Sequence, residues 1–170
     1  MQAISRFVHG VEAAVRLFGW IAAASCVALV FLVAGDVVVR YVFRAGAVWL
    51  QELHWHLISP IALFGMSYAL YCGEQVRVDV FYERFPPWLC RIIEVAGGLL
   101  LLVIGLYATK LSLPWVEMAW VRGEASPNPG GLPWRWALKA LIPLGFVLLA
   151  LQGLAHALRH GLNLPRPDIR

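Results

Sequence analysis

Uncharged stretches long enough to cross a membrane recur along the chain, separated by short charged links. Residues 17–35 carry no charge, residues 53–73 are interrupted only by His54 and His56, and residues 140–158 are again uncharged. Each stretch approaches the ~20 residues that cross ~30 Å of hydrocarbon as a helix. We therefore predict an all-α membrane domain covering residues 1–170. Its four transmembrane helices are expected at about residues 17–39, 50–73, 92–116 and 138–158.

The third predicted span is the least regular of the four. Only residues 95–109 separate Glu94 from Lys110, but apolar character continues from Ile92 to Val116. We include Lys110 in the span because its aliphatic stem can carry the ammonium group to the interface. All eight tryptophans of the chain fall within about two helical turns of a predicted span end. Amphipathic rings prefer the headgroup level, so the tryptophans support these boundaries independently.

The segments outside the spans are short. A tight turn is expected at residues 45–48, and Pro86-Pro87 suits the start of the third helix. The link from residue 117 to 135 contains Ser126-Pro-Asn-Pro-Gly-Gly-Leu-Pro133, which cannot form regular helix. Apolar residues at helical spacing before residue 17 predict an amphipathic lead-in lying on the membrane surface. The apolar stretch of the first span is longer than the core of a signal peptide, so we expect it to be retained.

Composition agrees with a membrane protein and excludes several other classes. The chain is 61% hydrophobic and only 14% charged, whereas soluble domains average about 45–50% and about 25%. A soluble domain, a disordered chain and a nucleic-acid binder are all disfavoured, the last because the basic residues form no run or stripe. The three cysteines lie far apart and form neither a disulfide framework nor a zinc pattern.

The distribution of Lys and Arg indicates an orientation. Eight of the 14 basic residues lie in the N-terminus, the second link and the C-terminal tail, which must share one side of the membrane. Six lie on the other side. The positive-inside rule therefore favours cytoplasmic termini. We call the opposite end of the spans the outer end.

Two pairs at i, i+4 spacing stand at the outer ends of the first two spans. Glu52 and His56 lie about 40° apart around a helix, so they can bind a metal, relay a proton, or simply hydrogen-bond each other or a neighbouring helix. Asp36 and Arg40 are expected to form an ion pair that orients the turn into the second span. Glu52 and His56 alone provide too few ligands for a metal ion, so no metal site is expected here.

Histidines in the second and fourth spans raise the question whether the chain binds haem as a membrane anchor. His156 and His160 share a helix face beside Arg159, but the fourth span ends on the inner side while the second begins on the outer side. His54 and His56 are therefore about a membrane thickness away from them. A haem bridging these spans through two axial histidines is geometrically excluded, and we expect no cofactor.

No span centre carries a charge, although carriers and channels usually place ionisable groups at that depth. The pattern predicts a membrane scaffold or anchor without catalytic residues. Six tryptophans lie on the outer side with the irregular 126–133 loop, and such aromatic residues favour protein docking. The proposed structural and docking residues of this outer layer are Asp36, Arg40, Trp49, Glu52, His56, Asn128 and Trp134.

Five motifs in order resemble one known family. They are Gly35-Asp-Val-Val-Val-Arg-Tyr-Val-Phe43, Trp49-Leu-Gln-Glu-Leu53, Gly73-Glu-Gln-Val-Arg-Val-Asp79, Asn128-Pro-Gly-Gly-Leu-Pro-Trp134 and Leu141-Ile-Pro-Leu-Gly-Phe146. Together they look like the small membrane (DctQ-like) subunit of tripartite ATP-independent periplasmic (TRAP) transporters, over about residues 17–155. In one departure, Gln51 stands where family members often carry the first of two adjacent acids.

The resemblance implies a four-helix, multi-pass protein of the bacterial inner membrane with cytoplasmic termini. It implies two partners besides membrane lipid: a large permease subunit that carries substrate and sodium ions, and a periplasmic substrate-binding protein for an organic-acid-type solute. The small subunit would brace the permease as a static scaffold. A membrane anchor of a redox complex is the alternative function, and a stand-alone small transporter is the third.

Overall fold

The computed structural model describes residues 2–44, 46–74 and 85–164. Within these ranges the chain forms four helices and no strand: α1 (Gln2–Phe43), α2 (Val48–Cys72), α4 (Pro87–Val121) and α5 (Arg135–Gly161). The all-α prediction is confirmed, and each predicted span lies within one helix apart from residue 73, which caps α2. Part of the Gly73–Asp79 motif lies outside the described residues, as do Arg77 and Arg84 from the second link.

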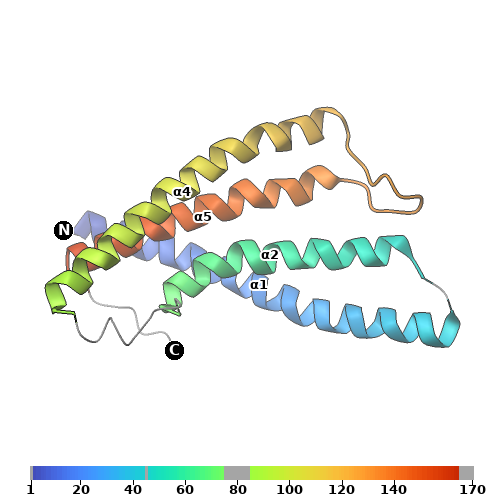
Figure 1. The fold of residues 1–170 in the computed structure, drawn as a ribbon, viewed down its shortest axis with the longest axis horizontal. Helices are drawn as coiled ribbons and strands as arrows, with labels where there is room; N and C mark the ends of the chain where they lie inside the picture. Colours follow the sequence, from blue (N-terminus) through green and yellow to red (C-terminus); the bar gives the residue numbers. More distant parts are fainter. Residues whose placement is uncertain (1, 45, 75–84, 165–170) are drawn as a thin grey trace.

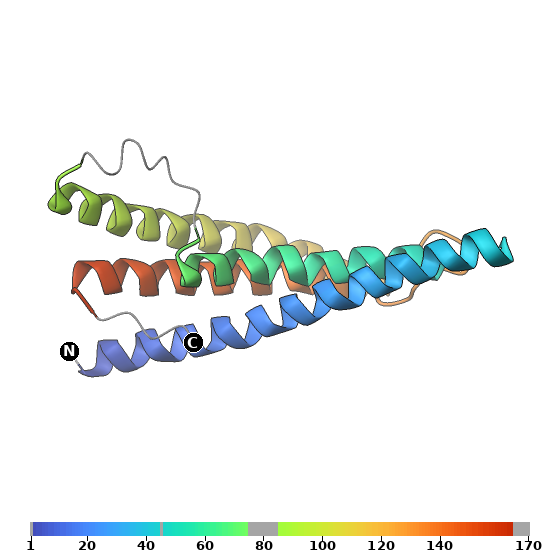
Figure 2. The same ribbon diagram turned by 90° about the horizontal axis from the view of Figure 1, so that it is seen from below.

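The helices pack as two antiparallel hairpins. α1 lies along α2 and α4 lies along α5, while α5 also contacts both α1 and α2 (Figure 1). The start of α1 and the end of α5 lie at the same end of the bundle, and the 122–134 link lies at the opposite, outer end (Figures 1 and 2). This arrangement agrees with the predicted relative topology.

Local sequence explains where the helices begin and end. Pro86 has an extended backbone and Pro87 occupies the first turn of α4, where a missing N–H is harmless. Gly73 ends α2 with a left-handed φ of 80°, and its N–H bonds to the carbonyl of Leu70 at 3.3 Å.

The predicted N-terminal lead-in is helical, but its apolar face does not lie on the membrane surface. Residues 2–16 continue without a break into the rest of α1. Val8, Val11 and Val15 are buried in the same cluster as Leu148 and Ala155 of α5. The expectation of a surface-lying segment was therefore wrong, because the sequence could not show that α5 covers this face.

Glycines bring α4 and α5 into close contact. A Cβ at Gly98 would lie 2.6 Å from the carbonyl oxygen of Gly153, and one at Gly105 would lie 2.8 Å from that of Phe146. Gly153 takes part in the same contact, because a Cβ there would lie 2.7 Å from the carbonyl oxygen of Gly98. At Gly65 no described atom lies within 4 Å of an added Cβ, so this glycine is not part of a close helix contact.

Three helices, α1, α4 and α5, are long and apolar enough to cross a membrane, by length and composition. Their outward faces carry many exposed large apolar side chains, such as Phe31, Val103 and Leu106, that water would not favour. α2 is not among the three, and its outer half contains Glu52, His54 and His56. Four membrane crossings therefore remain a prediction.

Candidate functional site

Glu52 connects α2 to the loop between α4 and α5. Its carboxylate accepts hydrogen bonds from the Ser126 hydroxyl, from the backbone N–H of Leu132 at 2.7 Å and from the Asn128 amide at 3.4 Å. These three donors lie 74 to 80 residues away in the sequence. One carboxylate therefore holds the middle of the loop, residues 126–132, against α2.

The loop adopts a compact form that brings its donors to Glu52. The N–H of Ser126 bonds to the carbonyl of Leu132 at 3.2 Å, and the N–H of Gly131 bonds to the carbonyl of Asn128 at 3.0 Å. Gly130 has a left-handed φ of 77°. A Cβ at Gly131 would collide with Ser126 and lie 2.8 Å from Glu52 Oε1. The Gly-Gly pair of the motif is thus explained by one turn and one close approach.

His56 does not pair with the Glu52 carboxylate. Its Nδ1–H instead donates to the backbone carbonyl of Glu52 at 2.8 Å, one turn earlier on α2. Of the alternatives, a hydrogen bond between the two side chains is not found, because the 126–132 loop offers the carboxylate three better-placed donors. This geometry gives no support to a metal site or proton relay formed by Glu52 and His56.

Asp36 and Arg40 form the expected ion pair near the end of α1. Arg40 Nη2 lies 2.8 Å from Asp36 Oδ2, and the Asp36 side chain is buried. The side-chain amide oxygen of Gln51, on α2, faces the guanidinium and accepts a hydrogen bond from Arg40 Nη2 at 2.5 Å. The pair therefore also joins α1 to α2. Asp36 Oδ1 is buried and has no hydrogen-bond partner among the described residues.

Two hollows flank these polar contacts. Asp36 and Trp49 line an apolar groove of about 430 Å³ between α1 and α2. Glu52, His56 and Asn128 line a smaller cavity of about 190 Å³, together with Arg135. The structure thus places Asp36 with Trp49, and Glu52 with Asn128, at the same outer end of the bundle.

Trp134 lies apart from Glu52. It precedes α5 in a left-handed conformation with φ 66°, which is uncommon for a residue with a side chain, and 70% of its surface is exposed. It shares a cavity of about 350 Å³ with Trp120 and Trp136, whose rings contact edge to face with centroids 4.5 Å apart. The outer end therefore presents exposed aromatic surface next to the Glu52-held loop.

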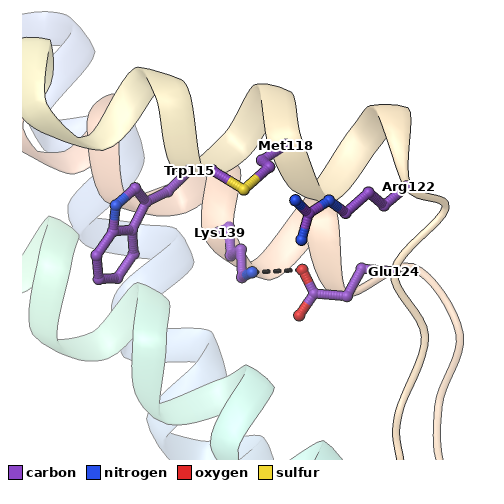
Figure 3. A pocket seen from close by; sticks show the side chains of 5 residues that line it. All are labelled: Trp115, Met118, Arg122, Glu124 and Lys139. Carbon is purple, nitrogen blue, oxygen red and sulfur yellow. Dashed lines mark hydrogen bonds and ion pairs between the residues drawn. The ribbon is translucent and has the colours of Figure 1, made fainter.

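A fourth hollow lies where α4 and α5 approach the loop (Figure 3). Lys139 of α5 bonds Glu124 at 2.5 Å, and Trp115, Met118 and Arg122 complete the lining of a cavity of about 320 Å³. The hydrogen bond from Lys139 lowers the pKa of Glu124. This ion pair fixes the start of the loop, as Glu52 fixes its middle.

Sequence reasoning missed two buried polar pairs at the other end of the bundle. Arg159 of α5 lies 2.6 Å from Glu12 of α1, and His156 of α5 lies 2.7 Å from Glu94 of α4. All four residues are buried. The sequence does indicate that ionisable residues within apolar helices need partners. It does not indicate which helices pack against each other, so the partners could not be identified.

The described polar groups hold helices and a loop together, and their geometry suits positioning rather than bond chemistry. Comparison with known families gives one match. The family described as "Tripartite ATP-independent periplasmic transporters, DctQ component" matches residues 29–161. No curated protein matches the chain.

Proposed function

The chain belongs to the DctQ component family of tripartite ATP-independent periplasmic transporters, and we propose that it braces the large permease and helps dock the periplasmic binding protein. It is thus the small component of such a transporter, and its family is one of transport components rather than enzymes. In this proposal it lies in the bacterial inner membrane with four spans and cytoplasmic termini. The large permease, in turn, couples uptake of an organic-acid-type solute to sodium ions.

The bracing role is supported by contacts that hold the two hairpins together at both ends of the bundle. At the inner end, the buried Glu12–Arg159 pair ties α1 to α5. At the outer end, the Glu52 contacts join α2 to the loop between α4 and α5. Within the second hairpin, the Gly98 contact brings α4 and α5 together. A subunit held at both ends is suited to stay fixed while a partner moves. Its exposed apolar faces offer the surface for lipid and the permease.

The docking role rests on one observation, the Glu52 carboxylate that holds the 126–132 loop against α2. A loop fixed in advance loses less conformational entropy when a partner binds. Exposed Trp55 lines a cavity with Asn128 and Arg135, and exposed Trp134 lines another with Pro133. Arg40 contacts Gln51, the neighbour of Glu52 on α2. Tryptophan and arginine are the residues enriched in the energetically important parts of protein interfaces.

The test compares two charge-neutralising substitutions of similar chemistry. Glu52→Gln keeps the size of the side chain but weakens its bonds to the loop. Glu117→Gln makes the same change on α4 at an exposed site, for which the described residues provide no ion pair or hydrogen bond. Each variant is reconstituted with the permease in liposomes. Co-purification with the permease, affinity for the binding protein and solute uptake are then measured.

We expect Glu52→Gln to keep the permease but to weaken binding of the binding protein and to slow uptake. Glu117→Gln should leave all three measurements near those of the wild-type chain. Full affinity and uptake in Glu52→Gln would refute the docking role. Loss of co-purification would instead assign Glu52 to the contact with the permease.

The proposal requires no haem, so the purified chain should show no stoichiometric Soret band. The family match does not support the alternative of a redox-complex anchor. A Soret band abolished by His56→Ala would contradict the proposed function and favour that alternative.

A further inference from the structure

Three side chains with metal-ligating atoms converge where α4 begins and α5 ends. Glu94 belongs to α4, whereas His156 and His160 lie one turn apart on α5. One ligand atom from each lies within 4.8 Å of the other two. His156 Nε2 is 2.7 Å from Glu94 Oε2, and the two imidazole centroids are 4.5 Å apart. Glu94 and His156 are buried, while His160 is partly exposed.

The helix backbones hold this cluster in place. Gly98 lies one turn after Glu94, and a Cβ there would be 2.6 Å from the Gly153 oxygen and 2.9 Å from the nitrogen of Ala157. A close approach of α4 and α5 is therefore next to the cluster. Ligands carried by two helices in such close contact are positioned before any ion binds.

The donor set is one that divalent transition metals use. Two imidazole nitrogens and one carboxylate form the three-protein-ligand arrangement of open zinc sites, and two histidines at i, i+4 supply a ligand pair from one helix face. Tetrahedral Zn²⁺ with bonds of about 2.0–2.1 Å places its ligand atoms about 3.3 Å apart. The His156–Glu94 contact must widen by several tenths of an ångström, and His160 must approach. Side-chain rotation supplies both movements.

Local charge favours binding of a cation, because Glu94 supplies a carboxylate. Arg159 lies between the two histidines in sequence, but its positive charge is compensated by Glu12 at 2.6 Å. The partial exposure of His160 leaves a path by which an ion can enter.

We propose that Glu94, His156 and His160 bind a divalent transition-metal ion, with Zn²⁺ as the expected ion, and that the ion joins α4 to α5. Ligation through His156 Nε2 requires the ring proton to reside on Nδ1. A protonated imidazole must release its proton before it binds, so affinity falls as the pH is lowered.

The test uses the full-length chain alone, purified in detergent without a polyhistidine tag and stripped with a chelator. Zn²⁺ is added back, bound zinc is measured by elemental analysis, and Co²⁺ serves as a spectroscopic probe. His160→Ala removes one ligand yet leaves the buried Glu94–His156 pair intact, so the fold should persist. His9→Ala is the matched control, because His9 is exposed and lies outside the cluster.

We expect about one zinc ion per chain, a zinc-dependent rise in melting temperature and a Co²⁺ absorption band. His160→Ala should weaken Zn²⁺ binding by about 10–100-fold or more, and His9→Ala should not change it. Equal binding by the wild-type chain and His160→Ala, or no binding by the wild-type chain, would overturn the proposal. Because no partner subunit is present, either result is independent of the docking and bracing roles.

Discussion

Two neighbouring glycines on α4 offer a test of the helix packing. A Cβ at Gly98 would lie 2.6 Å from the Gly153 oxygen and 3.0 Å from Ala157 Cβ, whereas a Cβ at Gly97 would meet no described atom within 4 Å. We therefore expect Gly98→Ala to destabilise the chain and Gly97→Ala to stabilise it slightly. The two variants add the same methyl group to adjacent positions of one helix.

The magnitude follows from two opposing terms. Replacing Gly by Ala within a helix stabilises by about 0.5–1 kcal/mol, and this gain is shared by both variants. At position 98 the methyl group must also push α4 and α5 apart, and overpacking of this kind costs about 1–3 kcal/mol. Since the shared gain cancels, the two variants should differ in free energy of unfolding by about 1–3 kcal/mol.

The assay is unfolding of the isolated chain in mixed micelles with increasing SDS, followed by circular dichroism. The isolated chain is used because Gly97 is exposed. A partner subunit packed against Gly97 in the full transporter would change the effect of Gly97→Ala. Equal unfolding free energies for Gly97→Ala and Gly98→Ala would refute the packing of α4 on α5 described above.

Three further predictions concern topology, buried charge and pH. With the three native cysteines replaced, Asn128→Cys should react with a membrane-impermeant thiol reagent in spheroplasts and Asn163→Cys should not; the reverse pattern would invert the orientation. Arg159→Leu should cost about 3–5 kcal/mol because it leaves Glu12 buried without its cation, and adding Glu12→Leu should recover much of this in the same unfolding assay; additive losses would refute the coupling. The hydrogen bond from Lys139 lowers the pKa of Glu124 below its ordinary value of 4.5. The ionised carboxylate therefore contributes its full stabilisation at a pH above 4.5, and this contribution disappears as the pH falls through the folded-state pKa. Melting curves of the wild-type chain and Glu124→Gln should therefore differ at neutral pH and converge in acid; a constant difference would contradict the pairing.

The sequence by itself determined the local architecture of this protein. Uncharged stretches predicted the helices, and Pro86-Pro87 predicted the start of α4. The Asp36–Arg40 pair was also predictable, because residues four apart on a helix are neighbours whatever surrounds them. These features depend only on helix geometry and on the preference of apolar side chains for a non-aqueous environment.

Tertiary structure decided which polar groups meet. The same i, i+4 argument failed for Glu52 and His56, because a loop some 74 to 80 residues away supplies the donors for the carboxylate. The Glu12–Arg159 pair spans 147 residues, and the Glu94–His156 pair spans 62. A buried charge needs a partner, and this requirement can be inferred from the sequence. The identity of the partner depends on which helices are adjacent, and packing along the whole length of the helices determines their adjacency.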